Sequence, residues 1–130
     1  MESWRTRYNH TLQGRIFPTS QPYCRASFRI EIYISTEYPF EVPKVIFLDR
    51  IYHINVSETG NYCCNWNMGD SEWRPTYSIA DMITKVLDSI DNPDLNCHIN
   101  TECLEEYQTD YSKFYRKALD MTLAHGRPRR

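Results

Sequence analysis

Strict alternation of apolar and polar side chains over residues 28–34 constrains the fold of this chain more than any other feature. Phe28, Ile30, Ile32 and Ile34 share one face, and Arg29, Glu31 and Tyr33 occupy the other. A period of two is typical of a β-strand that buries one face and exposes the other to water. The segment therefore predicts a strand of an antiparallel sheet with one solvated face.

Two neighbouring segments extend this strand into a meander. Residues 12–17 have the composition of a preceding strand, and the prolines at positions 18 and 22 supply a turn between the two. Residues 44–48 form a third short strand, which the proline-containing turn of residues 38–43 introduces. Consecutive strands joined by such turns predict an antiparallel meander.

The strongest helical pattern lies over residues 78–90. Its apolar side chains follow helix spacing at Ile79, Met82, Ile83, Val86, Leu87 and Ile90. Ser78, with Asp81 three residues later, predicts a capping box at the N-terminus. Asn92 and Pro93 end the helix, because a residue before proline avoids the helical conformation.

Two further helices are predicted towards the C-terminus, over residues 102–108 and from a cap at Asp110 to about residue 122. Strands come first and helices follow, which predicts an α+β fold: an antiparallel meander sheet, a long loop and C-terminal helices. No repeat or Gly/Ser linker divides the chain, and 130 residues suit a single domain over residues 1–130.

Charge and hydropathy exclude two classes of partner. The formal net charge is -2, whereas nucleic-acid binding is driven by clustered Lys and Arg, so no nucleic acid is expected. No apolar run approaches the roughly 18 residues of a membrane helix, so no membrane is expected either. The N-terminus lacks the apolar stretch of a secretory signal, which favours the cytoplasm and nucleus.

Five cysteines are present, and an odd count without a secretory signal favours reduced thiols over a disulfide framework. No Cys-x-x-Cys pair occurs, and the spacing of Cys97, His98 and Cys103 fits no standard zinc pattern. Most of these cysteines are interpreted as small buried apolar residues. Neither a metal nor another cofactor is expected.

The segment from residue 49 to residue 75 has no sustained period, and so long a loop inside a compact domain is commonly functional. Cys63 lies eight residues after Asn55, and His53 lies two residues before that amide. A thiolate beside an amide N–H donor suits thioester chemistry, in which the amide stabilises an oxyanion. On spacing alone, however, a structural role for Cys63 is favoured, because most free cysteines are inert.

The motifs in chain order resemble the ubiquitin-conjugating enzyme family. They are Tyr38-Pro39-Phe40-x-x-Pro43-Lys44, Arg50-Ile51-Tyr52-His53-x-Asn55, Gly60-x-x-Cys63 and Trp73-x-Pro75. The resemblance covers about residues 11–128. Phe28-Arg29-Ile30-Glu31-Ile32 and the basic Arg74 are similar to the branch of the family that transfers its cargo to a ligase cysteine.

The resemblance implies a role for each matching residue. Cys63 is the thioester-forming nucleophile, Asn55 is the oxyanion-stabilising or loop-bracing amide, and His53 holds the loop without transferring a proton. The ligase-binding surface is implied to contain Phe40, Glu41, Trp73, Arg74, Pro75 and Thr76. Exposure is expected for Phe40, whereas packing and docking roles are equally balanced for Trp73.

The implied partners are ubiquitin or a ubiquitin-like modifier, an ATP-dependent activating enzyme that supplies it, and a cysteine-dependent ligase that receives it. Departures from the family pattern sharpen this expectation. Ile54 replaces the proline of the family's His-Pro-Asn motif. Asn65 and Cys97 stand where members that attack lysine carry acidic residues. A lysine amine needs help to lose its proton and a thiol acceptor does not, so transfer to a ligase cysteine is favoured.

Glu41 stands where members with known ligases usually carry a lysine, and this reversal of sign predicts an altered or lost set of ligases. The first ten residues show no pattern of the amphipathic helix with which the family begins, so impaired charging by the activating enzyme is expected.

Three alternatives stay open. The chain could be a catalytically weak or inactive truncated family member that acts as a binding scaffold. It could also be a cysteine hydrolase that pairs Cys63 with His98, although only the residue types support this. Finally, the spacing from Asn55 favours Cys63 over the adjacent Cys64 as nucleophile, but a shift of one residue is conceivable.

Overall fold

A computed structural model describes residues 5–8, 10–62, 73–97 and 99–129 of the chain. Its sheet contains four strands in the sequential order β1-β2-β3-β4, and each neighbouring pair is antiparallel. The strands are β1 (Arg5–Tyr8), β2 (Thr11–Ile16), β3 (Phe28–Tyr33) and β4 (Lys44–Phe47). The predicted meander is therefore confirmed, with one strand more than the sequence indicated.

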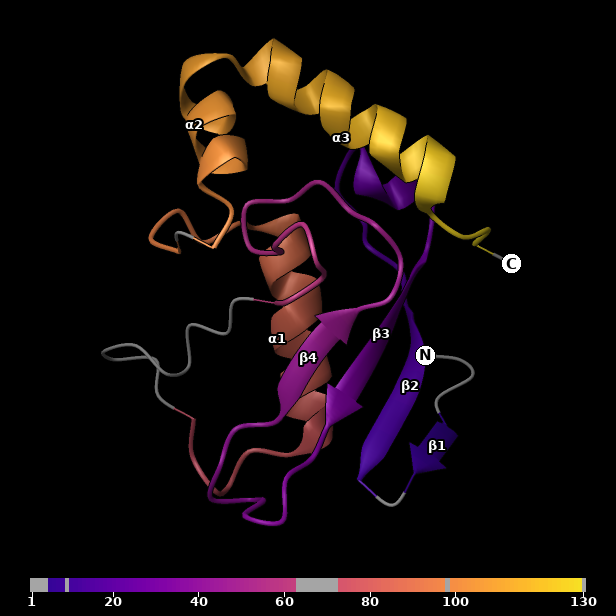
Figure 1. Ribbon diagram of the computed structural model, residues 1–130, viewed down its shortest axis with the longest axis vertical. Helices are drawn as coiled ribbons and strands as arrows, with labels where there is room; N and C mark the ends of the chain where they lie inside the picture. The colour runs from indigo at the N-terminus through magenta and orange to yellow at the C-terminus, as the bar shows by residue number, and fades with distance from the viewer. Residues whose placement is uncertain (1–4, 9, 63–72, 98, 130) are drawn as a thin grey trace.

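The helices follow the strands along the chain, as predicted for an α+β fold. They are α1 (Ile79–Asp91), α2 (Thr101–Thr109) and α3 (Tyr111–His125), and a short 3-10 helix, η1 (Tyr23–Arg25), precedes β3. Figure 1 shows α1 running along one face of the sheet, whereas α2 and α3 lie beyond one end of the strands, with η1 beneath α3.

The core lies between the sheet and α1. Ile30 and Ile32 of β3 are completely buried, and so are Met82 and Val86 of α1. The alternation in β3 thus directs its isoleucines towards the helix, while Glu31 and Tyr33 remain accessible. Burial of these side chains is the main favourable contribution to folding.

The first strand, β1, was not predicted. It pairs with β2 through Arg5 opposite Gln13 and Thr6 opposite Leu12, and the register shifts between Thr6 and Tyr8. No described residue of this segment is helical, in keeping with the missing helical pattern. A strand of four largely polar residues shows no alternation from which to predict it, and its pairing with β2 is a tertiary property.

The predicted caps form at the helix starts. The Ser78 backbone N–H donates to the Asp81 carboxylate at 2.7 Å, and the Asp81 N–H donates to the Ser78 hydroxyl at 3.1 Å, which completes the capping box of α1. The Asp110 carboxylate accepts from the Lys113 N–H at 3.3 Å at the start of α3. Within the described ranges, no helix is long and apolar enough to cross a membrane.

Candidate active site

The motif His53-Ile54-Asn55 lies inside the protein, on the segment that leaves β4 and returns towards the sheet. Exposed fractions of the three side chains are 0%, 0% and 1%. The Val56 N–H donates to the His53 carbonyl at 3.2 Å, and Val56 also forms an isolated β-bridge with Tyr62. Ile54, which replaces the expected proline, fills part of the hydrophobic core.

Both ring nitrogens of His53 are engaged. Nδ1 accepts from the Asn55 backbone N–H at 3.0 Å, so the proton of the neutral ring resides on Nε2, which donates to the Ile90 carbonyl at 3.1 Å. Complete burial lowers the pKa of His53 to about 4. The ring is therefore neutral at physiological pH and has no free nitrogen for proton transfer, an arrangement that suits a bracing role.

The Asn55 side chain binds the backbone of a single residue beyond α1. Its Nδ2 donates to the Asp94 carbonyl at 2.9 Å, and its Oδ1 accepts from the Asp94 N–H at 2.9 Å. This pair of hydrogen bonds joins two segments that are 39 residues apart in the chain. An amide NH₂ group carries two donors, and Asp94 accepts from one of them. The two hydrogen bonds therefore brace the loop, and they use only one of the two N–H donors of the amide.

The chain is tightly held as it approaches position 63. The Tyr62 hydroxyl lies 2.6 Å from the Ser89 hydroxyl of α1, and the Tyr62 N–H donates to the Val45 carbonyl at 3.2 Å. Gly60 has a φ of 94°, and a Cβ there would lie 2.4 Å from the Phe47 carbonyl oxygen, so only glycine fits. The expected nucleophile Cys63, its neighbour Cys64 and Asn65 lie outside the described residues.

Three described cysteines differ in their chemistry. Cys24 and Cys103 are free thiols, whereas the buried Cys97 is disulfide-bonded. The expectation of reduced thiols is therefore wrong for Cys97, because a cysteine count does not reveal which sulfurs meet in space. Burial, reinforced by Glu106 and Glu102, raises the pKa of Cys103 to about 12.

The metal-ligand pattern considered for Cys97, His98 and Cys103 gains no support. His98 lies outside the described residues. In the part of the chain that the structure describes, no group of three or more His, Cys, Asp or Glu side chains could hold a metal ion.

The residues expected to bind a ligase lie on two segments that Trp73 joins. The indole Nε1 donates to the Pro39 carbonyl at 2.7 Å, and the ring lies 6.4 Å from Tyr38 and 5.5 Å from Tyr77, centroid to centroid. Trp73 is half-buried against the core, so it does pack. It thereby holds the segment after position 72 against the turn that carries Phe40.

Around this junction the remaining expected residues are exposed. Phe40 has 77% of its surface accessible, which is unusual for a large apolar side chain and matches the expectation of exposure. Glu41, Arg74, Pro75 and Thr76 are exposed as well. The two segments therefore expose an apolar side chain and charges of both signs, and the hydrogen bond from Trp73 to Pro39 joins them.

Sequence reasoning missed the anchors of the site. The carbonyl of Ile90, the backbone of Asp94 and the hydroxyl of Ser89 hold His53, Asn55 and Tyr62 respectively. Backbone groups carry no side-chain signature, and Ser89 lies on the buried side of α1 without a pattern of its own. No local signal could have identified these partners.

Comparison with known proteins gives the class to which this fold and site belong. A model of the family described as "Ubiquitin-conjugating enzyme" matches residues 3–122, nearly the whole chain. The chain therefore belongs to the ubiquitin-conjugating enzyme family and is a transferase of that class.

Two relatives show how similar the chain is to individual members. It is 32% identical over 114 residues to ubiquitin-conjugating enzyme E2 ubc-18 of Caenorhabditis elegans, an alignment that covers 88% of this chain and 74% of the relative. It is 31% identical over 116 residues to ubiquitin-conjugating enzyme E2-18 kDa of Drosophila melanogaster, covering 89% of this chain and 75% of the relative. In general terms, membership of the family implies ubiquitin, an activating enzyme and a ligase as partners.

Proposed function

We propose that this protein carries ubiquitin or a ubiquitin-like protein as a thioester on Cys63 and transfers it to a cysteine of a ligase. The observation that carries the proposal is the braced amide of Asn55, which the Asp94 backbone holds through two hydrogen bonds of 2.9 Å. A fixed amide donor in a loop just ahead of a cysteine is what stabilisation of a thioester oxyanion requires.

Two thioester exchanges account for the reaction. The Cys63 thiolate attacks the thioester carbonyl of the modifier on the activating enzyme, whose cysteine thiolate leaves; ATP is consumed at that enzyme in the preceding step. The ligase cysteine thiolate then attacks the Cys63 thioester, and Cys63 leaves as the thiolate. In both exchanges the second N–H of the Asn55 amide stabilises the tetrahedral oxyanion.

A thiol is favoured as acceptor over a lysine amine because the loop beyond α1 offers no carboxylate at the position of Cys97. That residue is a buried cysteine, and its side chain has no carboxylate with which to take a proton from an ammonium group. The nearby Asp94 carboxylate accepts from the Asn96 N–H at 3.0 Å. A lysine acceptor would need a base to remove its proton, whereas a ligase thiolate needs none.

The exposed surface around Phe40 supports docking of the ligase. Its exposed Phe40, together with the polar side chains of Glu41, Arg74 and Thr76, has the mixed apolar and polar composition of protein–protein interfaces. The alternative of an inactive binding scaffold is not favoured, since the matched relatives bear the names of enzymes.

A charging assay tests the proposal. Because Cys97 is disulfide-bonded, the protein is first reduced with a phosphine and exchanged into reductant-free buffer. It is then incubated with activating enzyme, ATP and fluorescent ubiquitin, and adducts are separated with and without thiol reductant. We expect a thiol-sensitive adduct that Cys63→Ala abolishes and Cys64→Ala retains. An adduct that survives in Cys63→Ala would overturn the assignment, and no adduct with any modifier would favour the scaffold.

A discharge assay then tests the acceptor. The charged protein is mixed with free cysteine or with free lysine at equal concentration, and loss of the adduct is followed over time. We expect rapid discharge onto cysteine and little onto lysine. Equal rates onto the two acceptors would contradict the preference for a ligase thiol.

A further inference from the structure

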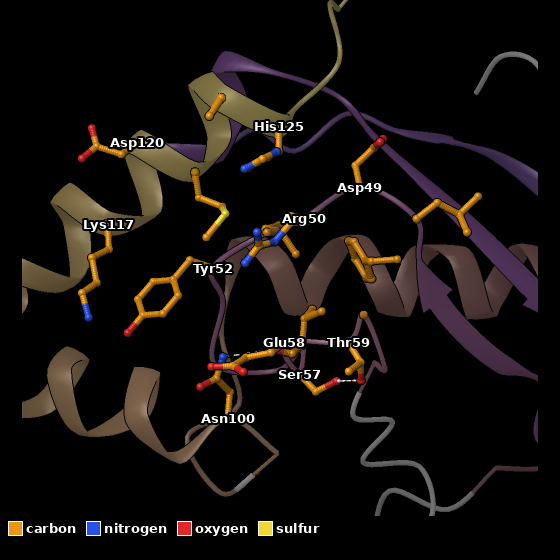
Figure 2. Close-up of a pocket in the computed structure, with 17 residues that line it drawn as sticks. Asp49, Arg50, Tyr52, Ser57, Glu58, Thr59, Asn100, Lys117, Asp120 and His125 are labelled. Carbon is orange, nitrogen blue, oxygen red and sulfur yellow. Dashed lines mark hydrogen bonds between the residues drawn. The ribbon is translucent and has the colours of Figure 1, made fainter.

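A cavity of about 550 Å³ lies between α3 and the segment that follows β4, and its described lining includes neither His53 nor Asn55. Its volume falls within the range of small-molecule sites in proteins. Apolar side chains line much of it, namely Phe47, Ile51, Val56, Met121 and Ala124. Figure 2 shows the cavity with α3 on one side and the loop carrying Ser57, Glu58 and Thr59 on the other.

Two of the charged groups at this cavity are neutralised within the protein. The Asp49 carboxylate forms ion pairs with Arg29 at 2.9 Å and with Arg127 at 3.0 Å. The Lys117 ammonium lies 3.1 Å from the Glu102 carboxylate and 2.7 Å from that of Glu106. These groups therefore have little charge left to offer a ligand.

Arg50 and His125 differ from those groups, because no hydrogen bond or ion pair to a described residue engages either side chain. Both are exposed, and Figure 2 shows His125 reaching from the end of α3 towards the loop that carries Arg50. The Asp120 carboxylate points away from them in the same view. Glu58, on the loop, also lines the cavity, and its negative charge counteracts the positive charge of Arg50.

We infer that this cavity binds a small organic acid with an aromatic or branched apolar body. The body contacts the apolar lining around Val56 and Met121, where removal of its surface from water supplies affinity. The carboxylate pairs with Arg50, because a guanidinium matches a carboxylate through two parallel hydrogen bonds. The ligand is therefore recognised by a charge pair as well as by apolar contact, and the carboxylate of Glu58 weakens its binding by repulsion.

The cavity wall is continuous with the loop of the candidate active site. Val56 donates its N–H to the His53 carbonyl at 3.2 Å, and its own carbonyl accepts from Asn100 Nδ2 at 3.2 Å. A ligand that binds only the folded arrangement stabilises the segment it contacts, and with it the position of Asn55. That a ligand in this cavity regulates modifier transfer rests on the proposed function, whereas the binding of the ligand does not.

Fluorine NMR with fluorophenylbutyrate as probe and its neutral amide as reference tests the site. We expect the acid to bind about five times more tightly than the amide, the gain of an exposed charge pair. Arg50→Gln removes this difference, and Arg116→Gln, an exposed arginine on α3 outside the cavity, leaves it unchanged. No binding of either probe at millimolar concentration, or an equal preference in Arg50→Gln and wild type, overturns the proposal.

Two variants of opposite effect complete the test. Glu58→Gln removes the repulsion and strengthens binding of the acid about twofold without changing that of the amide. Ala124→Phe adds a large side chain at an exposed position that lines the cavity, so both probes lose affinity while the fold is retained. Unchanged binding in Ala124→Phe would place the probes elsewhere. None of these measurements uses the charging assay, so failure of the site and failure of the proposed function are separate results.

Discussion

Two regions of this molecule carry the motifs of one enzyme family but are built in opposite ways. In the loop of His53 and Asn55, the side chains are buried and their polar atoms are bound to protein groups. On the surface of Phe40, Glu41 and Arg74, the side chains are exposed to solvent. Substitution of a motif residue in the first region should therefore change stability, whereas in the second region, the proposed ligase-binding surface, it should change binding and leave stability unaffected.

The largest effect is expected for Asn55→Ala. The substitution leaves the N–H and carbonyl of Asp94 without their partner, and each partly buried group loses a hydrogen bond worth about 1 kcal/mol or more, so the free energy of unfolding falls by about 2–3 kcal/mol. Denaturant unfolding measures the change. Asn96→Ala, in an exposed side chain on the same loop, should stay within about 0.5 kcal/mol. Equal effects of the two variants would contradict the bracing role.

The hydrogen-bond partners of this loop lie far away in the sequence, and this limits how much of the loop could be predicted. The sequence identifies His53 and Asn55 as motif residues, but their hydrogen bonds join groups 37 and 39 residues apart. Local periodicity does not encode such pairs. The isoleucines of β3 and the capping box of α1, in contrast, follow from spacing alone, because strand and helix periods are local.

The same distinction explains the other differences. Strand β1 exists because it pairs with β2, and the bond of Cys97 depends on the position of another sulfur; neither leaves a local pattern. The exposure of Phe40 followed from the family resemblance, since its hydrophobicity alone favours burial. The sequence thus predicts elements with an internal period, and the tertiary fold determines the rest.

Acidification should have the second largest effect on the free energy of unfolding. Burial lowers the pKa of His53 to about 4 from its ordinary value of 6.5. Below pH 6.5 the unfolded chain therefore binds a proton that the folded protein does not, so stability is complete above that pH and falls as the pH drops towards 4. The loss at pH 5 is about 2 kcal/mol.

Unfolding in denaturant at pH 7 and pH 5 measures this loss, and His53→Gln provides the control. The amide of glutamine does not titrate, so the variant is less stable at pH 7 but should lose much less stability on acidification to pH 5. The carboxylates with lowered pKa, such as Asp49 and Asp91, become protonated at lower pH, which keeps their contribution apart. An identical pH dependence in wild type and variant would contradict the burial of a neutral imidazole.

A smaller effect on stability is expected for Trp73→Phe, because Trp73 is half-buried. Phenylalanine keeps most of the apolar contact with Tyr38 and Tyr77 but removes the indole N–H that donates to the Pro39 carbonyl. We expect a loss of about 1 kcal/mol in unfolding free energy. Because the bond joins the two segments of the proposed ligase-binding surface, ligase affinity should fall as well. Arg74→Ala should leave the free energy of unfolding unchanged. A loss of stability as large as that of Trp73→Phe would contradict the division between packed and exposed residues.

The smallest effect on stability, and the sharpest on recognition, is expected for Glu41→Lys. The side chain is exposed, so the free energy of unfolding should change by less than about 0.5 kcal/mol. A lysine restores the charge that family members with known ligases usually carry, and charge complementarity governs the choice of partner at such a surface. Titration with a ligase that binds lysine-bearing relatives should therefore show binding by Glu41→Lys and little by the wild type. Phe40→Ala in the Glu41→Lys background should abolish that binding without a loss of stability, since Phe40 is 77% exposed. If Glu41→Lys binds no better than wild type, the reversed charge is not what excludes these ligases.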